Sequence, residues 1–265
     1  MLTVKAMYVI IVREFKRFFR QRGRLFSSLA RPLLWLFIIG SGMGRIVQGQ
    51  EIGSYRQFMF PGVLGLVVLF SSITSALSTV YDREFGAMRL MLVAPVSRLS
   101  IVIGKIISGS VLSVFQAVLL LIWLPVVGFQ IGWGQLFMLI AFLIVVSLAI
   151  SSLGMLLATR IDSLENFAAI MNFVVFPMFF LSGGLYPIKR LPQVLQTMIY
   201  LNPLTYGIDL FKHALLSQTA GSSMAAEFPV AVDIGVLLIF TLITLFLAAI
   251  WFDKEAKLVR LSKRG

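Results

Sequence analysis

The feature that most constrains this chain is a set of long stretches without a charged residue. One of them runs from Ile106 to Thr159. A single helix of that length would reach about 80 Å at 1.5 Å per residue, whereas the hydrocarbon core of a bilayer is about 30 Å thick. The run therefore predicts two membrane-spanning helices, Ile106–Val127 and Gln135–Thr159, separated by a glycine-rich turn at residues 128–134.

The composition indicates a membrane protein and excludes several kinds of site. Only 13% of the 265 residues are charged and the mean hydropathy is +0.96, whereas about a quarter of the residues of a soluble domain are charged. The chain has no cysteine, which excludes disulfides, thiolate zinc sites, iron–sulfur clusters and cysteine nucleophiles. The net charge of +12 resides mainly beside the apolar runs, so we attribute it to membrane topology and anionic lipid, and expect no nucleic-acid partner.

We predict an all-α integral membrane protein with six transmembrane helices in residues 27–252. The remaining four are expected within residues 27–44, Gln57–Tyr81, Asn166–Ile188 and Ile234–Phe252. The run Leu191–Ile208 could be a seventh span, but an odd number would place the basic tail, residues 253–265, outside. With six spans both termini are cytoplasmic, together with most of the 23 Lys and Arg residues.

Residues 1–26 are expected to form an amphipathic helix in the cytoplasmic interface. Aromatic and aliphatic residues recur at helical spacing, and basic residues follow the other face: Tyr8, Ile11, Val12, Phe15, Phe18 and Phe19 against Arg13, Lys16, Arg17, Arg20 and Arg24. Such a helix either anchors the chain or braces the first span. The sequence leaves both roles open.

The cytoplasmic segment between spans two and three, residues 82–98, carries an apolar stripe. Phe85, Met88 and Leu92 lie three and four residues apart, and Pro95 follows them. The spacing predicts a short helix with one apolar face. The face could pack on the chain's own spans or meet a partner.

The outer segment between spans five and six, residues 182–215, is expected to enter the membrane as broken helices. Ser182, Gly183 and Gly184 end span five, and Asn202 before Pro203 is a strong helix start. Two short half-helices are predicted, near Gln193–Tyr200 and near Pro203–Leu215. The segment either seals the bundle or forms an outer gate.

Two passages resemble the membrane subunit of type-2 ABC transporters, in particular the branch of daunorubicin-resistance and nodulation-factor export permeases. Residues 82–86 and 92–98, with Gly104 and Lys105 beyond, are similar to the coupling helix of that family. Residues 180–187 and 201–209 are similar to its outer re-entrant segment. The likeness covers the chain in the order of its spans and the length of its loops.

The resemblance implies a permease subunit in an ATP-driven exporter of a bacterial cytoplasmic membrane. An amphipathic, drug-like or lipid-like substrate would leave the cytoplasm or inner leaflet; a polysaccharide or glycolipid is the alternative substrate class. The implied partners are two copies of an ABC ATPase, a second permease copy (identical or a close paralogue), and membrane lipid. The chain has no GxxxxGK[ST] loop, so ATP and Mg²⁺ are expected on the partner ATPase and no cofactor on this chain.

Three groups of residues are candidates for these roles. The resemblance assigns contact with the ATPase to Arg83, Glu84, Phe85, Gly86, Met88, Arg89, Leu92, Pro95 and Arg98. It assigns the outer gate to Ser182, Gly183, Gly184, Pro187, Asn202, Pro203 and Tyr206. Bulky Phe and Met side chains with scattered amides suggest a substrate pathway lined by Gln116, Asn172, Phe176 and Met178.

Other functional classes have weaker support in the sequence. His213 is the one histidine, and Asp209 lies one helical turn before it; two ligands fall short of a metal site, so we expect a hydrogen bond at an interface. No catalytic residue is expected, and the uncharged spans disfavour an ion-driven carrier. A membrane scaffold or sensor that transports nothing is the remaining alternative.

The topology can be tested by cysteine labelling, because the natural chain is free of cysteine. Ser97→Cys is expected to react with a membrane-impermeant maleimide applied from the cytosolic side. Ser222→Cys is expected to react from the outside. Labelling of both positions from one side would contradict the six-span topology.

Overall fold

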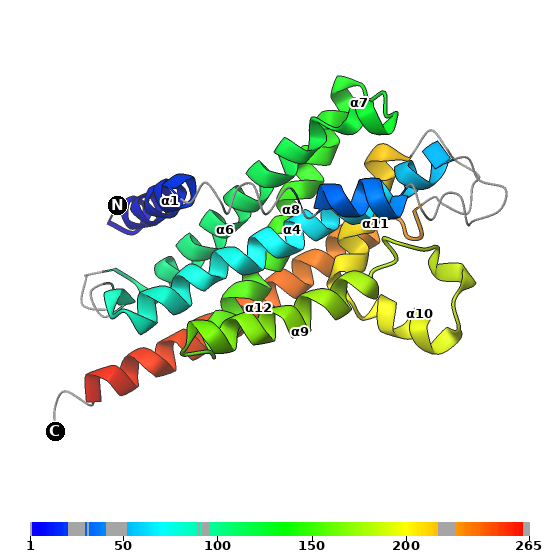
Figure 1. Ribbon diagram of the computed structural model, residues 1–265. Coiled ribbons are helices and arrows are strands. Elements are labelled where there is room, and N and C mark those ends of the chain that lie inside the picture. Colours follow the sequence, from blue (N-terminus) through cyan, green and yellow to red (C-terminus); the bar gives the residue numbers. More distant parts are fainter. Residues whose placement is uncertain are drawn as a thin grey trace.

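The computed structural model describes residues 2–20, 30, 32–40, 52–88, 91, 96–216 and 226–261. Within these residues the regular structure is helical (Figure 1). The elements are α1 (Leu2–Arg20), the π-helix η1 (Trp35–Ile39), α4 (Ile52–Glu84), α6 (Arg98–Leu121), α7 (Leu124–Val127), α8 (Trp133–Ala158), α9 (Leu164–Phe180), the 3-10 helix η2 (Ile188–Arg190), α10 (Gln193–Tyr200), α11 (Pro203–Leu215) and α12 (Val230–Leu261).

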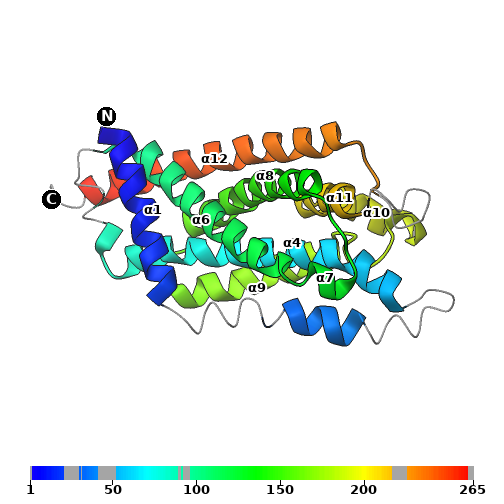
Figure 2. The same cartoon turned by 90° about the horizontal axis from the view of Figure 1, so that it is seen from above.

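Four of the described helices are long and apolar enough to cross a membrane: α4, α6, α8 and α12. They run side by side with α9, and α1 crosses the bundle at the end where α12 finishes (Figure 2). We call this end the α1 end and the opposite end the α11 end. Span one was predicted within residues 27–44. Of this range the structure describes residue 30 and residues 32–40, which are helical.

The predicted spans differ from the helices mainly at their ends. The turn predicted at residues 128–134 is confirmed, because Gly128 adopts a left-handed conformation with φ of 95° after α7. Span five was expected within residues 166–188 and to end at residues 182–184, and α9 ends just before them, at Phe180, after 17 residues, about 25 Å. A turn containing Gly183, whose φ is +68°, stops the helix there.

Helix α4 is the centre of the bundle. It packs on α6, α8, α9 and α11, and 83% of its apolar segment is buried, compared with 17% of the apolar segment of α12. The residues of α4 supply much of the main apolar core, including Phe58, Phe60 and Leu64. Helix α12 therefore turns most of its apolar surface outward.

The outer segment sits directly on α4 at a contact between two glycines. A Cβ atom on Gly62 would lie 2.4 Å from the carbonyl oxygen of Gly184, and one on Gly184 would lie 2.8 Å from the Cα of Gly62. No side chain fits between these backbones. The two glycines thus fix how closely the turn after α9 approaches α4.

Replacing Gly62 with alanine should therefore destabilise the bundle. We expect Gly62→Ala to lower the free energy of unfolding by about 1–3 kcal/mol, as overpacking does in other cores. The measurement is the thermal melting temperature of the purified chain in detergent. Gly134→Ala, where nothing lies within 4 Å of the added Cβ, is the matched control, and equal melting of the two variants would contradict the close contact.

Candidate functional site

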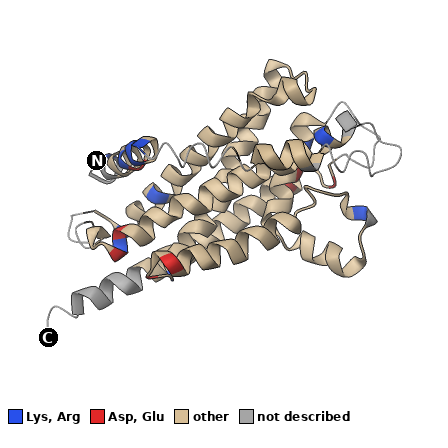
Figure 3. Cartoon of the chain, viewed as in Figure 1, with Lys and Arg blue, Asp and Glu red and all other residues tan. Residues whose placement is uncertain are grey.

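Charged residues gather toward the two ends of the bundle and leave its middle largely apolar (Figure 3). Those at the α1 end include residues of α1, α4 and α6. Those at the α11 end include residues of α11 and α12 and Lys189 of η2.

A buried lysine joins three helices at the α1 end. The Lys105 Nζ on α6 donates hydrogen bonds to Glu14 Oε1 of α1 at 2.8 Å and to Asp82 Oδ2 of α4 at 2.6 Å. A third bond goes to Ser78 Oγ at 3.1 Å. All four residues are buried. Each carboxylate is therefore neutralised inside the protein rather than by water.

Two arginines of α1 complete this arrangement, which we call the basal charge cluster (Arg13, Glu14, Arg17, Asp82 and Lys105). Arg13 donates to Asp82 and, at 3.0 Å, to Glu14. Arg17 lies 3.7 Å from Asp82 Oδ1. Burial by itself raises the pKa of the Glu14 carboxyl, but Lys105 and Arg13 outweigh burial and hold this pKa below its usual range. Glu14 therefore stays ionised.

The buried face of α1 differs from the apolar face that the pattern predicted. Ile10, Glu14 and Phe18, each one turn apart, are buried, while Tyr8 is 68% exposed and Phe19 is 45% exposed. The helix predicted over these residues is confirmed, but one of its inward residues is an acid. The signal in the sequence was a lone glutamate on a helix that is otherwise basic.

The predicted stripe of residues 85–92 is divided between surface and core. Phe85 is 63% exposed and its ring stacks on Tyr81 with 4.3 Å between centroids. Met88 is buried against the chain's own α6 and α12, in a cluster with Ile101 and Phe252. Of these two residues, only Phe85 offers surface to a partner.

Gly86 follows Phe85 with φ of +79°, a conformation that favours glycine, and directs the chain out of α4. Ser97 then caps α6 by accepting a hydrogen bond from the Ser100 amide. Arg98 is the first residue of α6 and is partly buried. Arg89, Leu92 and Pro95 lie outside the described residues.

Arg83 and Glu84 hold the loop between α8 and α9 against the end of α4. Arg83 Nη1 donates to the carbonyl oxygens of Ala158 at 2.9 Å and Ile161 at 2.7 Å. Glu84 Oε2 accepts from the Leu164 amide at 2.9 Å, at the first turn of α9. Both side chains therefore form bonds within the chain, whereas the family resemblance assigned them to contact with the ATPase.

At the α11 end, the two short helices predicted in the outer segment are confirmed as α10 and α11. Asn202 caps α11 through Oδ1, which accepts from the Leu204 amide at 3.1 Å, and Pro203 follows at the first turn. The Asn202 Nδ2 donates to the carbonyl oxygens of Met178 and Leu181, each at 2.6 Å. One side chain thus ties the end of α9 to the start of α11.

The other predicted outer residues also hold this segment together. Ser182 Oγ donates to the Phe179 carbonyl at 2.5 Å and accepts from the Gly184 amide at 3.3 Å. Tyr206 donates its hydroxyl proton to the Tyr200 carbonyl at 2.8 Å. Pro187 precedes η2 in an extended conformation. These bonds fix the segment as a unit, whether it acts as a seal or a gate.

A second buried group of charges, which the sequence only partly predicted, links α11 to α12. Asp209 accepts from the amides of Glu227 and Phe228 at 2.9 Å, and Lys212 Nζ lies 4.0 Å from Asp209 Oδ1. His213 Nε2 lies 2.7 Å from the Phe228 carbonyl oxygen and 3.8 Å from Asp233 Oδ2. The hydrogen bond expected of His213 is thus present.

Asp233 adds a third possible ligand, a second carboxylate, to the Asp209–His213 pair noted in the sequence. Ligand atoms of Asp209, His213 and Asp233 lie within 4.8 Å of one another. The buried Lys212 ammonium beside them opposes a second cation by direct repulsion. We therefore interpret the group as an ion-paired link between helices.

The predicted pathway residues do not form a common lining within the described chain. Gln116 on α6 is buried, and its Oε1 lacks a hydrogen-bond partner. Asn172 and Phe176 are exposed on α9, and Met178 is partly buried.

Comparison with known proteins places this geometry in a family. The family model described as ABC-2 type transporter matches residues 5–216, which include both ends of the bundle described above. The chain belongs to the ABC-2 type transporter family. Family membership and the long apolar helices make it an integral membrane protein and a transport permease subunit, and imply an ABC ATPase as its partner.

The sequences of curated relatives match this chain over most of their length. The chain is 30% identical to transport permease ycf38 of Cyanophora paradoxa over 263 residues, covering 96% of this chain and 90% of the relative. It is 27% identical to Nodulation protein J of Rhizobium leguminosarum bv. viciae over 225 residues, 83% of this chain and 82% of the relative. A similar protein from Rhizobium leguminosarum bv. trifolii is 30% identical over 233 residues, 84% and 83% of the two chains.

The basal charge cluster predicts a large effect of removing its lysine. Lys105→Met leaves Glu14 and Asp82 buried without their shared cation, and breaking such a group typically costs about 3–5 kcal/mol. We expect a marked fall in the thermal melting temperature of the purified chain. Lys16→Met, an exposed lysine on α1, is the control and should change stability by less than about 0.5 kcal/mol. Similar melting of the two variants would show that the cluster contributes little.

Proposed function

We propose that this chain is the transmembrane subunit of an ATP-driven exporter that moves an amphipathic, drug-like or lipid-like substrate out of the cytoplasm or inner leaflet. Two ABC ATPase subunits and a second permease copy would complete the transporter. The observation that carries the proposal is an exposed aromatic side chain, Phe85, on a helix end that is braced from several sides.

The proposed topology places the α1 end in the cytoplasm. Helix α1 and the end of α12 lie there together (Figures 1 and 2), as an even number of spans requires. Helix α1 is rich in Lys and Arg, which favours the cytoplasmic side. The first of the six crossings would be formed by the residues around η1. Helix α9 would cross together with part of the outer segment, which adds the length that α9 lacks.

The physical role of Phe85 would be to bury its ring in a cleft of the ATPase. Because the chain has no phosphate-binding loop of its own, the energy of ATP hydrolysis has to arrive through such a contact. A partner that closes when it binds ATP can favour one packing of the permease helices over another. To do so it must bind the permease more tightly in the favoured packing.

The bonds at the α1 end supply a route for this bias. Asp82 passes a displacement of α4 to α6 and α1 through Lys105. Arg83 passes it to the loop between α8 and α9. A movement at Phe85 would thus reach four helices through charged contacts rather than through a flexible loop.

Truncating Phe85 tests the proposal. Phe85→Ala removes an exposed ring without disturbing the core, so the melting temperature should stay unchanged while affinity for the ATPase falls by about 2 kcal/mol, roughly thirtyfold. The measurements are ATPase binding to the purified chain and hydrolysis stimulated by substrate in proteoliposomes.

Phe137→Ala provides the control, since Phe137 on α8 is 69% exposed and lies away from the α1 end. It should leave both measurements unchanged. Normal ATPase affinity and normal export with Phe85→Ala would refute the docking role of this residue.

A further inference from the structure

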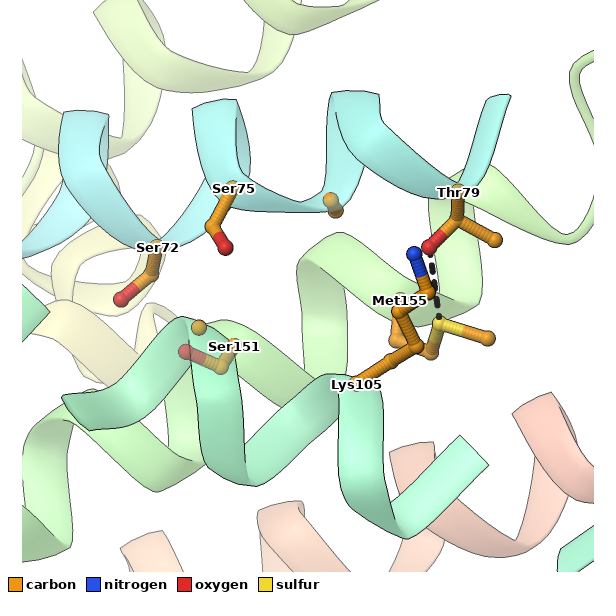
Figure 4. Close-up of a pocket in the computed structure, with 8 residues that line it drawn as sticks. Ser72, Ser75, Thr79, Lys105, Ser151 and Met155 are labelled. Carbon is orange, nitrogen blue, oxygen red and sulfur yellow. Dashed lines mark hydrogen bonds between the residues drawn. The ribbon is translucent and has the colours of Figure 1, made fainter. Parts of the chain in front are cut away.

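A small polar cavity lies inside the bundle where α4, α6 and α8 meet, next to the basal charge cluster. Its walls include Ser72, Ser75 and Thr79 of α4, Lys105 of α6, and Ser151 and Met155 of α8 (Figure 4). The space open to the centre of a water molecule is about 10 Å³, which matches the room that a single water needs.

Two hydroxyl groups on the cavity wall lack hydrogen-bond partners. Ser72 is 1% exposed and Ser151 is 3% exposed, and the Oγ of each has no partner. Figure 4 shows the Ser72 and Ser75 side chains extending from α4 toward the helix that carries Ser151. A buried hydroxyl without a hydrogen-bond partner destabilises the folded protein, because it has given up its bonds to water. The arrangement therefore favours an occupant that can bond to both.

A glycine creates the space. A Cβ atom on Gly109 of α6 would lie 3.2 Å from Ser151 Oγ and 3.3 Å from Ser75 Oγ. The missing side chain thus leaves a notch between hydroxyls of two neighbouring helices. Alanine at this position would fill the notch with a methyl group.

The chemistry of the wall selects the occupant. The Lys105 ammonium opposes a metal cation, and its three N–H groups already donate to Glu14, Ser78 and Asp82, so none is left for an anion. Water both donates and accepts hydrogen bonds, as two unpaired hydroxyls require. We propose that this cavity binds one water molecule, which hydrogen-bonds to Ser72 and Ser151.

The proposed water has a mechanical consequence, which rests on the proposed transport function. It joins α4 and α8 through bonds that can be exchanged, at the point where the charged α1 end meets the apolar core. A helix that shifts against its neighbours can trade a direct bond for a water-mediated one at little cost. The site would let α4 and α8 move relative to each other without leaving the hydroxyls of Ser72 and Ser151 unpaired.

Radiolytic oxidation of methionine can detect this water without measuring transport. X-ray pulses produce hydroxyl radicals from water; a radical formed inside the cavity would add to the Met155 sulfur, and dissolved oxygen would complete the two-electron oxidation to the sulfoxide. Met155 is 1% exposed and Met59 on α4 is 0% exposed, so bulk radicals reach neither. In the purified full chain we expect Met155 to be oxidised several-fold faster than Met59, as quantified by peptide mass spectrometry.

Variants then assign the signal to the cavity. Gly109→Ala should slow the oxidation of Met155 toward the rate of Met59, whereas Gly235→Ala, a helical glycine with open space around it, should not. If Gly109→Ala does not fold, the double variant Ser72→Ala with Ser151→Ala removes the hydroxyls without adding volume and should slow the oxidation as well.

Two results would overturn the proposal. One is a Met155 rate equal to that of Met59 in the natural chain. The other is a fast Met155 rate that persists in the folded cavity variants. Neither depends on export, so a failure here is distinguishable from a failure of the transport function, which the Phe85→Ala experiment tests.

Discussion

The arrangement of this chain depends on one ammonium group placed among carboxylates away from water. Lys105 binds Glu14 and Asp82 at 2.8 and 2.6 Å, and both acids are far from Lys105 in the sequence. Charges in such surroundings interact strongly because little water screens them, and a charge left alone there is costly. The cost of burying an unpaired charge also makes the arrangement specific, because Lys105 reaches Glu14 and Asp82 only when α6 is correctly placed against α1 and α4. Phe85 leaves the bundle just beyond this fixed point.

The loops on either side of α9 are held by different interactions. The loop between α8 and α9 is tied by full charges, because Arg83 and Glu84 bind it. The turn after α9 is held by backbone proximity at Gly62 and Gly184 and by the amide of Asn202. A charged contact tolerates small displacements, because electrostatic attraction falls slowly with distance, whereas a contact between two glycine backbones does not. The loop before α9 is thus better suited to receive a movement and the turn after α9 to resist one.

Much of the fold could be predicted from the sequence, because apolar runs and helix-start residues act locally. The turn at Gly128, the Asn202 cap and the bounds of α10 and α11 follow from such local signals. The family resemblance from residues 82–105 and 180–209 is confirmed. Pairings between distant residues could not be predicted in this way. The sequence marks Lys105 only as part of the family likeness, whereas in the structure it lies two turns inside α6 and bonds to Glu14 of α1. Spacing groups Met88 with Phe85, although Met88 packs on α12. Helical periodicity reports which residues share a face and not what that face meets.

The position of Glu14 also constrains how the chain is built. Glu14 is synthesised long before Lys105, its distant partner in the finished protein. The buried pairing of Glu14 with Lys105 therefore cannot form until α6 has been made. If α6 were misplaced, Glu14 would lose the lysine that holds α1 to the bundle.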